Sequence, residues 1–182
     1  MEWKHITLGK FIQLQEILKS DDEDLTKKID IYALLTDSPL EEIREIPLGI
    51  FLKAYSTELK FMETEIPQVI PKYWEHNKVQ YNITTQIEKL KAGQYIDYKH
   101  HSKTPNQFHN IMAVLCYDGD KYDGETHKQR AELFYNNMPV TIAFPLAVFF
   151  LELWNAWSAI SLEYSANQIM EMQADFQKTT VG

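Results

Sequence analysis

The chain is poor in cysteine and glycine. Its 182 residues include a single cysteine, Cys116, so no intrachain disulfide can form and a reducing compartment is favoured. Cys116 closes an apolar run and has no evident histidine partner, which predicts a buried small side chain and no nucleophile. The six glycines form no GxxxxGK[ST], GxGxxG or GxSxG motif. We therefore expect no nucleotide-binding loop, no nucleophile elbow and no cofactor.

Positive charge and long apolar runs are scarce as well. The sequence has 26 acidic and 18 basic residues, a formal net charge of −8, and no cluster of lysine or arginine, which argues against nucleic acid as a partner. Residues 1–5 lack the basic start and apolar core of a secretory signal. Residues 138–151 carry no charge, but these fourteen residues are too few to span a bilayer and Glu152 follows them. We expect a buried helix there, no membrane association and no export.

Helical periodicity is what the chain has in abundance. It predicts a single domain over residues 1–182 that is mainly α with a small β-hairpin (α+β), a compact helical domain with a long C-terminal helix. Four amphipathic helices are expected in residues 1–66. The first covers about 8–19 with Thr7 as its N-cap, and the second follows the stripe Leu25, Ile29, Tyr32 and Ala33.

Two proline-containing signals define the next helices. Ser38 and Glu41 have the spacing of a capping box, with Pro39 at the first helical position. Pro47 opens the fourth helix, whose buried face is expected to contain Leu48, Phe51, Leu52, Tyr55 and Leu59.

Residues 67–85 change to the alternation of paired strands. Val79, Tyr81 and Ile83 alternate with polar residues, and a turn near Asn77 would pair them with the strand that holds Tyr73 and Trp74. Because a lone hairpin is marginal in water, we expect the apolar face containing Tyr73, Trp74, Val79 and Tyr81 to pack against the helices or another chain.

Residues 86–137 return to helical spacing. Three helices are expected here. The first covers about 90–101, the second begins after a second capping box at Thr104 and Gln107, and the third covers about 126–136. An acidic, turn-rich loop that contains Asp118–Asp123 lies before the last of them.

Residues 138–182 are expected to form the long C-terminal helix, with Pro145 as a kink or a restart. Its apolar stripe is longer than a core of this size needs, and it continues as a narrow seam among polar residues. We predict that this helix binds a partner through Trp154, Trp157, Ile169, Met172 and Phe176. Packing back on its own domain is the alternative.

Two groups of side chains resemble cation ligands. Asp118, Asp120 and Asp123 offer clustered oxygens, but an EF-hand needs glycine where Asp123 stands and glutamate where Gln129 stands, so whether this loop binds a cation stays open. His100, His101 and His109 lie near Asp97, which is one helical turn before His101. Without an HExxH motif or a cysteine pair, we predict no metal site there.

Several short stretches resemble one family. The opening Trp3–Phe11, the segment Ala92–Asp97 and the step His109–Ile111, followed by the tyrosine-containing acidic loop and a final apolar helix, are similar in order to small uncharacterised proteins encoded among the virion and tail genes of crAss-like and related bacteriophages. The resemblance covers most of the chain and carries no catalytic residues. It implies a protein made in the host cytoplasm and located in the virion.

Within that context we expect a non-enzymatic virion-associated protein, a structural or cargo component of the capsid or tail. It would act through contacts with other phage structural proteins or with itself as a homo-oligomer. A tail assembly chaperone that shields hydrophobic segments and leaves the particle is the alternative, and a metal-dependent phage enzyme comes third. Short-tailed crAss-like phages need no long tape measure, which favours the virion role.

Overall fold

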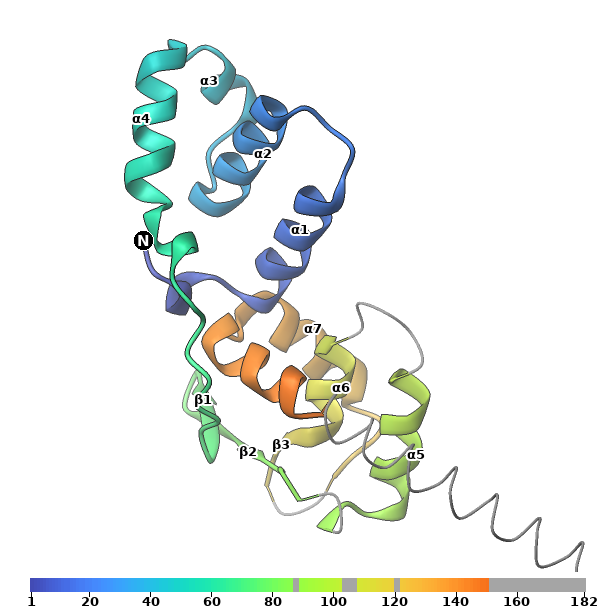
Figure 1. Ribbon diagram of the computed structural model, residues 1–182. Helices are drawn as coiled ribbons and strands as arrows, with labels where there is room; N and C mark the ends of the chain where they lie inside the picture. The colour runs from blue at the N-terminus through green and yellow to red at the C-terminus, as the bar shows by residue number, and fades with distance from the viewer. Residues whose placement is uncertain (87–88, 103–107, 120–121, 151–182) are drawn as a thin grey trace, which may run out of the picture. The chain divides into compact units, whose positions relative to one another are not determined.

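The computed structural model describes residues 1–86, 89–102, 108–119 and 122–150 (Figure 1). The chain divides into two compact units, Met1–Leu146 and a second that begins at Ala147. The described residues are mainly helical and include a small three-stranded antiparallel sheet, so the predicted α+β class is confirmed. Residues 140–150 are helical without a restart at Pro145, and the rest of the predicted C-terminal helix lies outside the described residues.

Residues 1–66 contain the four helices that their periodicity predicts. Thr7 caps the first of them as expected, because its hydroxyl oxygen accepts a hydrogen bond from the Lys10 backbone N–H at 3.3 Å. The apolar faces share one core, in which Leu14, Leu35 and Phe51 are each 2% exposed or less. The elements are η1 (Trp3–His5), α1 (Leu8–Lys19), α2 (Asp24–Thr36), α3 (Leu40–Arg44), α4 (Leu48–Glu58) and η2 (Lys60–Glu63).

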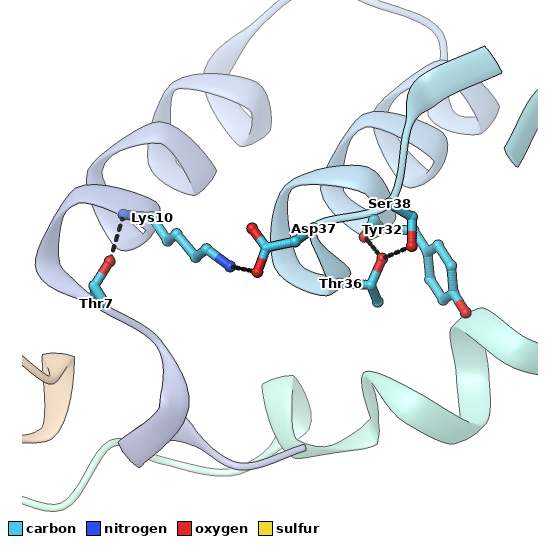
Figure 2. Close-up of polar contacts among 6 residues, drawn as sticks. All are labelled: Thr7, Lys10, Tyr32, Thr36, Asp37 and Ser38. Atoms are coloured by element: carbon cyan, nitrogen blue, oxygen red, sulfur yellow. Dashed lines mark hydrogen bonds and ion pairs between the residues drawn. The ribbon is translucent and has the colours of Figure 1, made fainter. Parts of the chain in front are cut away.

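The predicted capping box of Ser38 and Glu41 is wrong. Helix α3 begins at Leu40, and its N-cap residue is Pro39, which makes no side-chain hydrogen bond. The Ser38 hydroxyl is instead hydrogen-bonded to the hydroxyl of Thr36 at 2.9 Å (Figure 2). Ser38 therefore serves the end of α2 and is not available to cap the start of α3.

The end of α2 is tied to the first turn of α1. The chain leaves α2 through Asp37, whose φ of 56° is left-handed, as is common just after a helix. The Asp37 carboxylate accepts a hydrogen bond from Lys10 Nζ at 2.7 Å (Figure 2). Because the Asp37 side chain is well exposed, this ion pair contributes orientation more than stability.

Helix α4 buries a narrower face than its sequence predicts. Phe51 and Leu59 are 2% and 4% exposed, and the Phe51 ring packs edge-on against Tyr32 of α2 with centroids 5.7 Å apart. Leu48 and Leu52 are 56% and 40% exposed, so the prediction that they are buried is wrong. The face of α4 that contains Phe51 packs against the core, and no described residue covers the neighbouring face that contains Leu48 and Leu52.

The predicted hairpin is confirmed. Strands β1 (Tyr73–His76) and β2 (Val79–Ile83) pair antiparallel around Asn77 and Lys78, whose φ values of 49° and 65° are those of a type I′ turn. Trp74 and Tyr81 are each 7% exposed. Their rings lie 5.4 and 5.1 Å, centroid to centroid, from a phenylalanine ring on the helix over residues 127–137.

The outer face of the hairpin corrects one expectation. Tyr73, on the outer face, is 50% exposed, although it was expected on the packed face with Trp74 and Tyr81. Val79 lies on the same face as Tyr81, at the turn end of β2, and is 37% exposed. Successive strand residues point to opposite faces, so Tyr73 and Trp74 could not both turn inward. Trp74 and Tyr81 form the inner pair, directly opposite each other in the register.

A third strand, β3 (Cys116–Asp118), was not predicted. It pairs antiparallel with β2, where Asn82 lies opposite Tyr117 and Ile83 opposite Cys116. The first residues of the predicted acidic loop are therefore in the sheet. A three-residue strand has too little alternation of its own to be visible in sequence.

Three further helices belong to the first unit, α5 (Ala92–His101), α6 (Phe108–Leu115) and α7 (His127–Asn137). All three were predicted, although the expected capping box at Thr104 and Gln107 lies outside the described residues. Met112 and Leu115 of α6 are fully buried. The N-terminal chain joins this part through two backbone hydrogen bonds of 2.8 Å, from Leu8 N–H to the Met138 carbonyl and from Val140 N–H to the Ile6 carbonyl.

Candidate functional site

An apolar groove of about 720 Å³ runs along α1. Its volume is within the range of sites that bind ligands, and the majority of its lining is apolar. Helix α1 contributes Phe11 and Leu18, and the chain after α4 contributes Met62 and Ile66. The remaining apolar lining residues are Trp3, Ile12, Leu14, Phe108 and Phe144.

Edge-on aromatic contacts shape the groove. The centroid of the Trp3 ring lies 4.9 Å from that of Phe61 and 6.2 Å from that of Phe11, with interplanar angles of 82° and 77°. The centroids of Phe11 and Phe144 lie 5.6 Å apart, with an interplanar angle of 75°. These are the arrangements that aromatic quadrupoles favour. The Trp3 indole N–H also donates a hydrogen bond to the Thr64 carbonyl at 2.9 Å, which joins η1 to the chain after η2. The groove is therefore preformed.

The rim of the groove is polar and its surroundings are acidic. Glu16, Lys19 and Glu65 lie at the edge. Residues 1–66 contain fourteen acidic and eight basic side chains, which accounts for six of the eight net negative charges. Such a field attracts a ligand with positive charge outside an apolar centre. Leu18, which is 46% exposed, extends the apolar lining to the solvent.

The residues of the groove come from four segments far apart in the chain, and sequence reasoning did not group them. One signal was present: Leu14 and Ile17 widen the apolar stripe of α1 beyond Leu8, Phe11 and Ile12. A stripe that wide exceeds the face needed for one core contact. Phe11 and Leu14 contact the N-terminal core and also line the groove.

Two of the three histidines considered as metal ligands, His101 of α5 and His109 of α6, lie at a second feature together with His127 of α7. We call these three residues the histidine junction. The rings of His101 and His127 stack with centroids 4.6 Å apart and planes at 8°. His127 was not predicted to belong to this group, because it is on a helix 26 residues beyond His101. The third ring, of His109, has a buried Nδ1 with no hydrogen-bond partner in the structure.

The side chains at the junction do not have the arrangement of a metal centre. Among the described residues, no three histidine, cysteine, aspartate or glutamate side chains are placed to hold an ion. Asp97, the other suggested ligand, accepts a hydrogen bond from the Tyr122 hydroxyl at 2.7 Å. Burial, followed by the Asp97 carboxylate, raises the pKa of Tyr122 above its ordinary value.

Helix α6 ends in the core, where its last carbonyls need protein partners. The carbonyl of Ala113 accepts from Nε and Nη2 of Arg130 on α7 at 3.1 and 3.0 Å. The carbonyl of Val114 accepts from Nε2 of the buried Gln94 on α5 at 3.1 Å, and that of the last helical residue accepts from the backbone N–H of Thr84 at 3.0 Å. One helix end therefore holds α5, α7 and the chain after β2 together.

Arg130 also fixes the loop before α7. Only 6% exposed, it donates to the Asp123 carbonyl at 3.1 Å and to the Thr126 hydroxyl at 2.6 Å, and lies over the Tyr122 ring. Asp123 in turn accepts from the Glu125 backbone N–H at 2.9 Å. These contacts hold the turn at 123–126 in its conformation.

Two other predictions have different outcomes. Cys116 is buried as predicted, with no exposed surface, and burial raises its thiol pKa to about 12. The predicted partner-binding residues Trp154, Trp157, Ile169, Met172 and Phe176 lie outside the described residues. Within the part of the chain that the structure describes, no helix combines the length and apolarity needed to cross a bilayer.

Comparison with protein-family models, with curated proteins and with solved structures found no match.

Proposed function

We propose that the chain is a non-enzymatic, virion-associated bacteriophage protein, a structural or cargo component that works through protein–protein contacts. In this proposal the α1 groove binds an apolar segment of another phage structural protein. The phage context rests on the sequence resemblance, and the groove supports the mode of action. The stretch Trp3–Phe11, on which part of the resemblance rests, supplies two of the aromatic groove residues.

The occupant we propose is an amphipathic segment with apolar anchors and basic flanks. The apolar lining recovers free energy by removing such anchors from water, at about 25 cal/mol per Å² of apolar surface. The net charge of six negative units on residues 1–66 favours basic flanks and disfavours acidic ones. Because the aromatic contacts already hold the groove in shape, binding requires little ordering of this chain.

A tail assembly chaperone is the second candidate. Leu48, Ile50 and Leu52 of α4 are 56%, 63% and 40% exposed, in addition to the groove. Exposed apolar surface of this kind suits a protein that shields hydrophobic segments temporarily. Quantitative mass spectrometry of purified particles separates the two roles, because a virion component remains in the particle and a chaperone does not.

The groove itself is tested with a pair of matched substitutions, Leu18→Gln in the groove and Leu48→Gln on α4. The two leucines are 46% and 56% exposed, so the stability costs should be similar. Because Leu18 is already about half-buried, covering the rest of its side chain with a partner contributes roughly half of the value for a whole leucine, about 0.7 to 1.5 kcal/mol, which is about a threefold to tenfold loss of bound protein. We expect Leu18→Gln to reduce the amount in particles, or in complexes with tail proteins, and Leu48→Gln to leave it unchanged. Equal incorporation of both variants would contradict the groove as the binding site.

A further inference from the structure

One wall of the α1 groove belongs to a stretch of chain whose backbone is unpaired. Residues 65–71, between η2 and β1, follow one another without a turn or bend (Figure 1). Among the described residues, no backbone group is hydrogen-bonded to an N–H or a carbonyl of this stretch. Its one carbonyl with a donor is that of Ile66, which accepts from the side chain of Gln68 at 2.9 Å. The stretch therefore has backbone donors and acceptors available to a partner.

The prolines of this stretch leave one of its edges able to pair. In an extended chain, alternate residues direct their N–H and C=O groups to the same edge. Ile66, Gln68 and Ile70 form one such set, and each of them has an N–H. Pro67 and Pro71 belong to the other set and have none. Of the set that keeps its donors, Ile66 and Gln68 line the groove.

We propose that the α1 groove binds its occupant in an extended conformation, as an added strand paired with the backbone of Ile66, Gln68 and Ile70. Because the groove is the proposed protein-binding site, this assignment rests on the proposed function and specifies the class of segment that fits it. That segment has apolar side chains at alternate positions and basic residues at its ends. One row of side chains enters the apolar lining, and the backbone supplies the hydrogen bonds.

A helical occupant would leave this wall unpaired. A helix satisfies its backbone groups internally, so it has no donors or acceptors for Ile66 and Gln68 except at its ends. An extended segment has unpaired groups of its own and can exchange them with the wall, as in the addition of a strand to a sheet edge. Each such hydrogen bond contributes about a fivefold gain in affinity.

The charged lining residues determine which ends the segment has. Glu16 of α1 and Glu65 of the extended wall are exposed and line the groove, as does Lys19. Within the part of the chain that the structure describes, none of the three makes an ion pair. Two unpaired carboxylates and one unpaired ammonium group leave the rim acidic. The rim therefore selects lysine or arginine on the occupant, which adds more to specificity than to affinity.

Peptide binding tests the backbone pairing. The probe is the acetylated and amidated peptide Lys-Val-Thr-Val-Thr-Val-Lys with a fluorescein label, and its binding to the whole chain is followed by fluorescence anisotropy. A matched peptide has N-methyl groups on its three central residues, so it keeps every side chain but loses backbone donors. We expect the matched peptide to bind about fivefold or more weakly than the first.

Three substitutions assign the pairing to one edge. Gln68→Pro removes an N–H from the pairing set, Gln68→Ala removes the same side chain but keeps the N–H, and Val69→Pro removes an N–H from the other set. Neither N–H has an acceptor among the described residues, so neither proline breaks a hydrogen bond of the free protein. We expect Gln68→Pro to bind the first peptide about fivefold more weakly than Gln68→Ala, and Val69→Pro to bind it within about twofold of the unmodified protein.

The variant Leu18→Gln distinguishes this assignment from the proposed function. It should weaken binding of the first peptide about threefold or more, because Leu18 lines the groove. If Leu18→Gln weakens binding while Gln68→Pro and Gln68→Ala bind equally, the groove binds protein segments without backbone pairing, and the assignment is overturned. No binding to the unmodified protein, or equal binding of both peptides, would also overturn it. The particle assay with Leu18→Gln and Leu48→Gln then decides the proposed function separately.

Discussion

Gly9 is the second residue of α1, and a methyl group added there would meet α7. The new carbon would lie 2.6 Å from the ring of Tyr135 and 2.8 Å from the Tyr135 backbone oxygen. The ring can rotate, but the backbone oxygen cannot move alone, because the hydrogen bond between Leu8 and Met138 holds the two segments together. Overpacking of this kind costs about 1 to 3 kcal/mol, against a gain of up to about 1 kcal/mol for replacing a helical glycine by alanine. We therefore expect Gly9→Ala to lower the free energy of unfolding by about 1 to 2 kcal/mol.

The chain supplies two matched controls. Gly49 and Gly93 are likewise the second residues of their helices, α4 and α5, and an added carbon at either position has no atom within 4 Å. Gly49→Ala and Gly93→Ala should therefore raise the free energy of unfolding by up to about 1 kcal/mol, so the same substitution has opposite signs.

Urea unfolding followed by far-UV circular dichroism, with linear extrapolation to water, measures all three variants. We expect the change in the free energy of unfolding for Gly9→Ala to have the opposite sign from that for Gly49→Ala. If Gly9→Ala is as stable as the unmodified protein while Gly49→Ala is stabilised, then α1 and α7 are not in the close contact described here.

Two further predictions concern the sheet. Lys78 has a φ of 65° in the type I′ turn, where glycine is unstrained, so Lys78→Gly should stabilise the protein by about 1 kcal/mol in urea unfolding, whereas Lys72→Gly, just before β1, should not. Cys116 is fully buried and burial raises its pKa to about 12, so the native protein should react with a thiol reagent at mildly alkaline pH only as fast as it unfolds. Prompt labelling of the folded protein would show that this thiol is accessible.

The helices of the described chain could be predicted closely because their signals are local. Thr7 caps α1 and Pro47 precedes α4 at the predicted positions. The hairpin turn near Asn77 was predicted from residues adjacent to it. The error at Ser38 has the same local origin, since a hydroxyl two residues before a helix has the same spacing whether it serves that helix or the preceding one.

Features that depend on distant partners could not be predicted in the same way. Strand β3 exists because β2 offers it a paired edge, and Leu48 is exposed because nothing described covers that face of α4. Arg130 reads as a charged surface residue in sequence, yet it is buried against the carbonyl of Ala113.

The sequence by itself determined the α+β class, the helix and hairpin positions and the scarcity of recognisable catalytic motifs, because each depends on residues within one or two turns of chain. Only the tertiary structure decided that α1 lines a groove with Met62 and Phe144, and that His101 stacks on His127. Periodicity shows that a helix has an apolar face, but which part of that face stays open depends on the helices packed around it. The same holds for two histidines on different helices, whose distance is set by the packing of α5, α6 and α7.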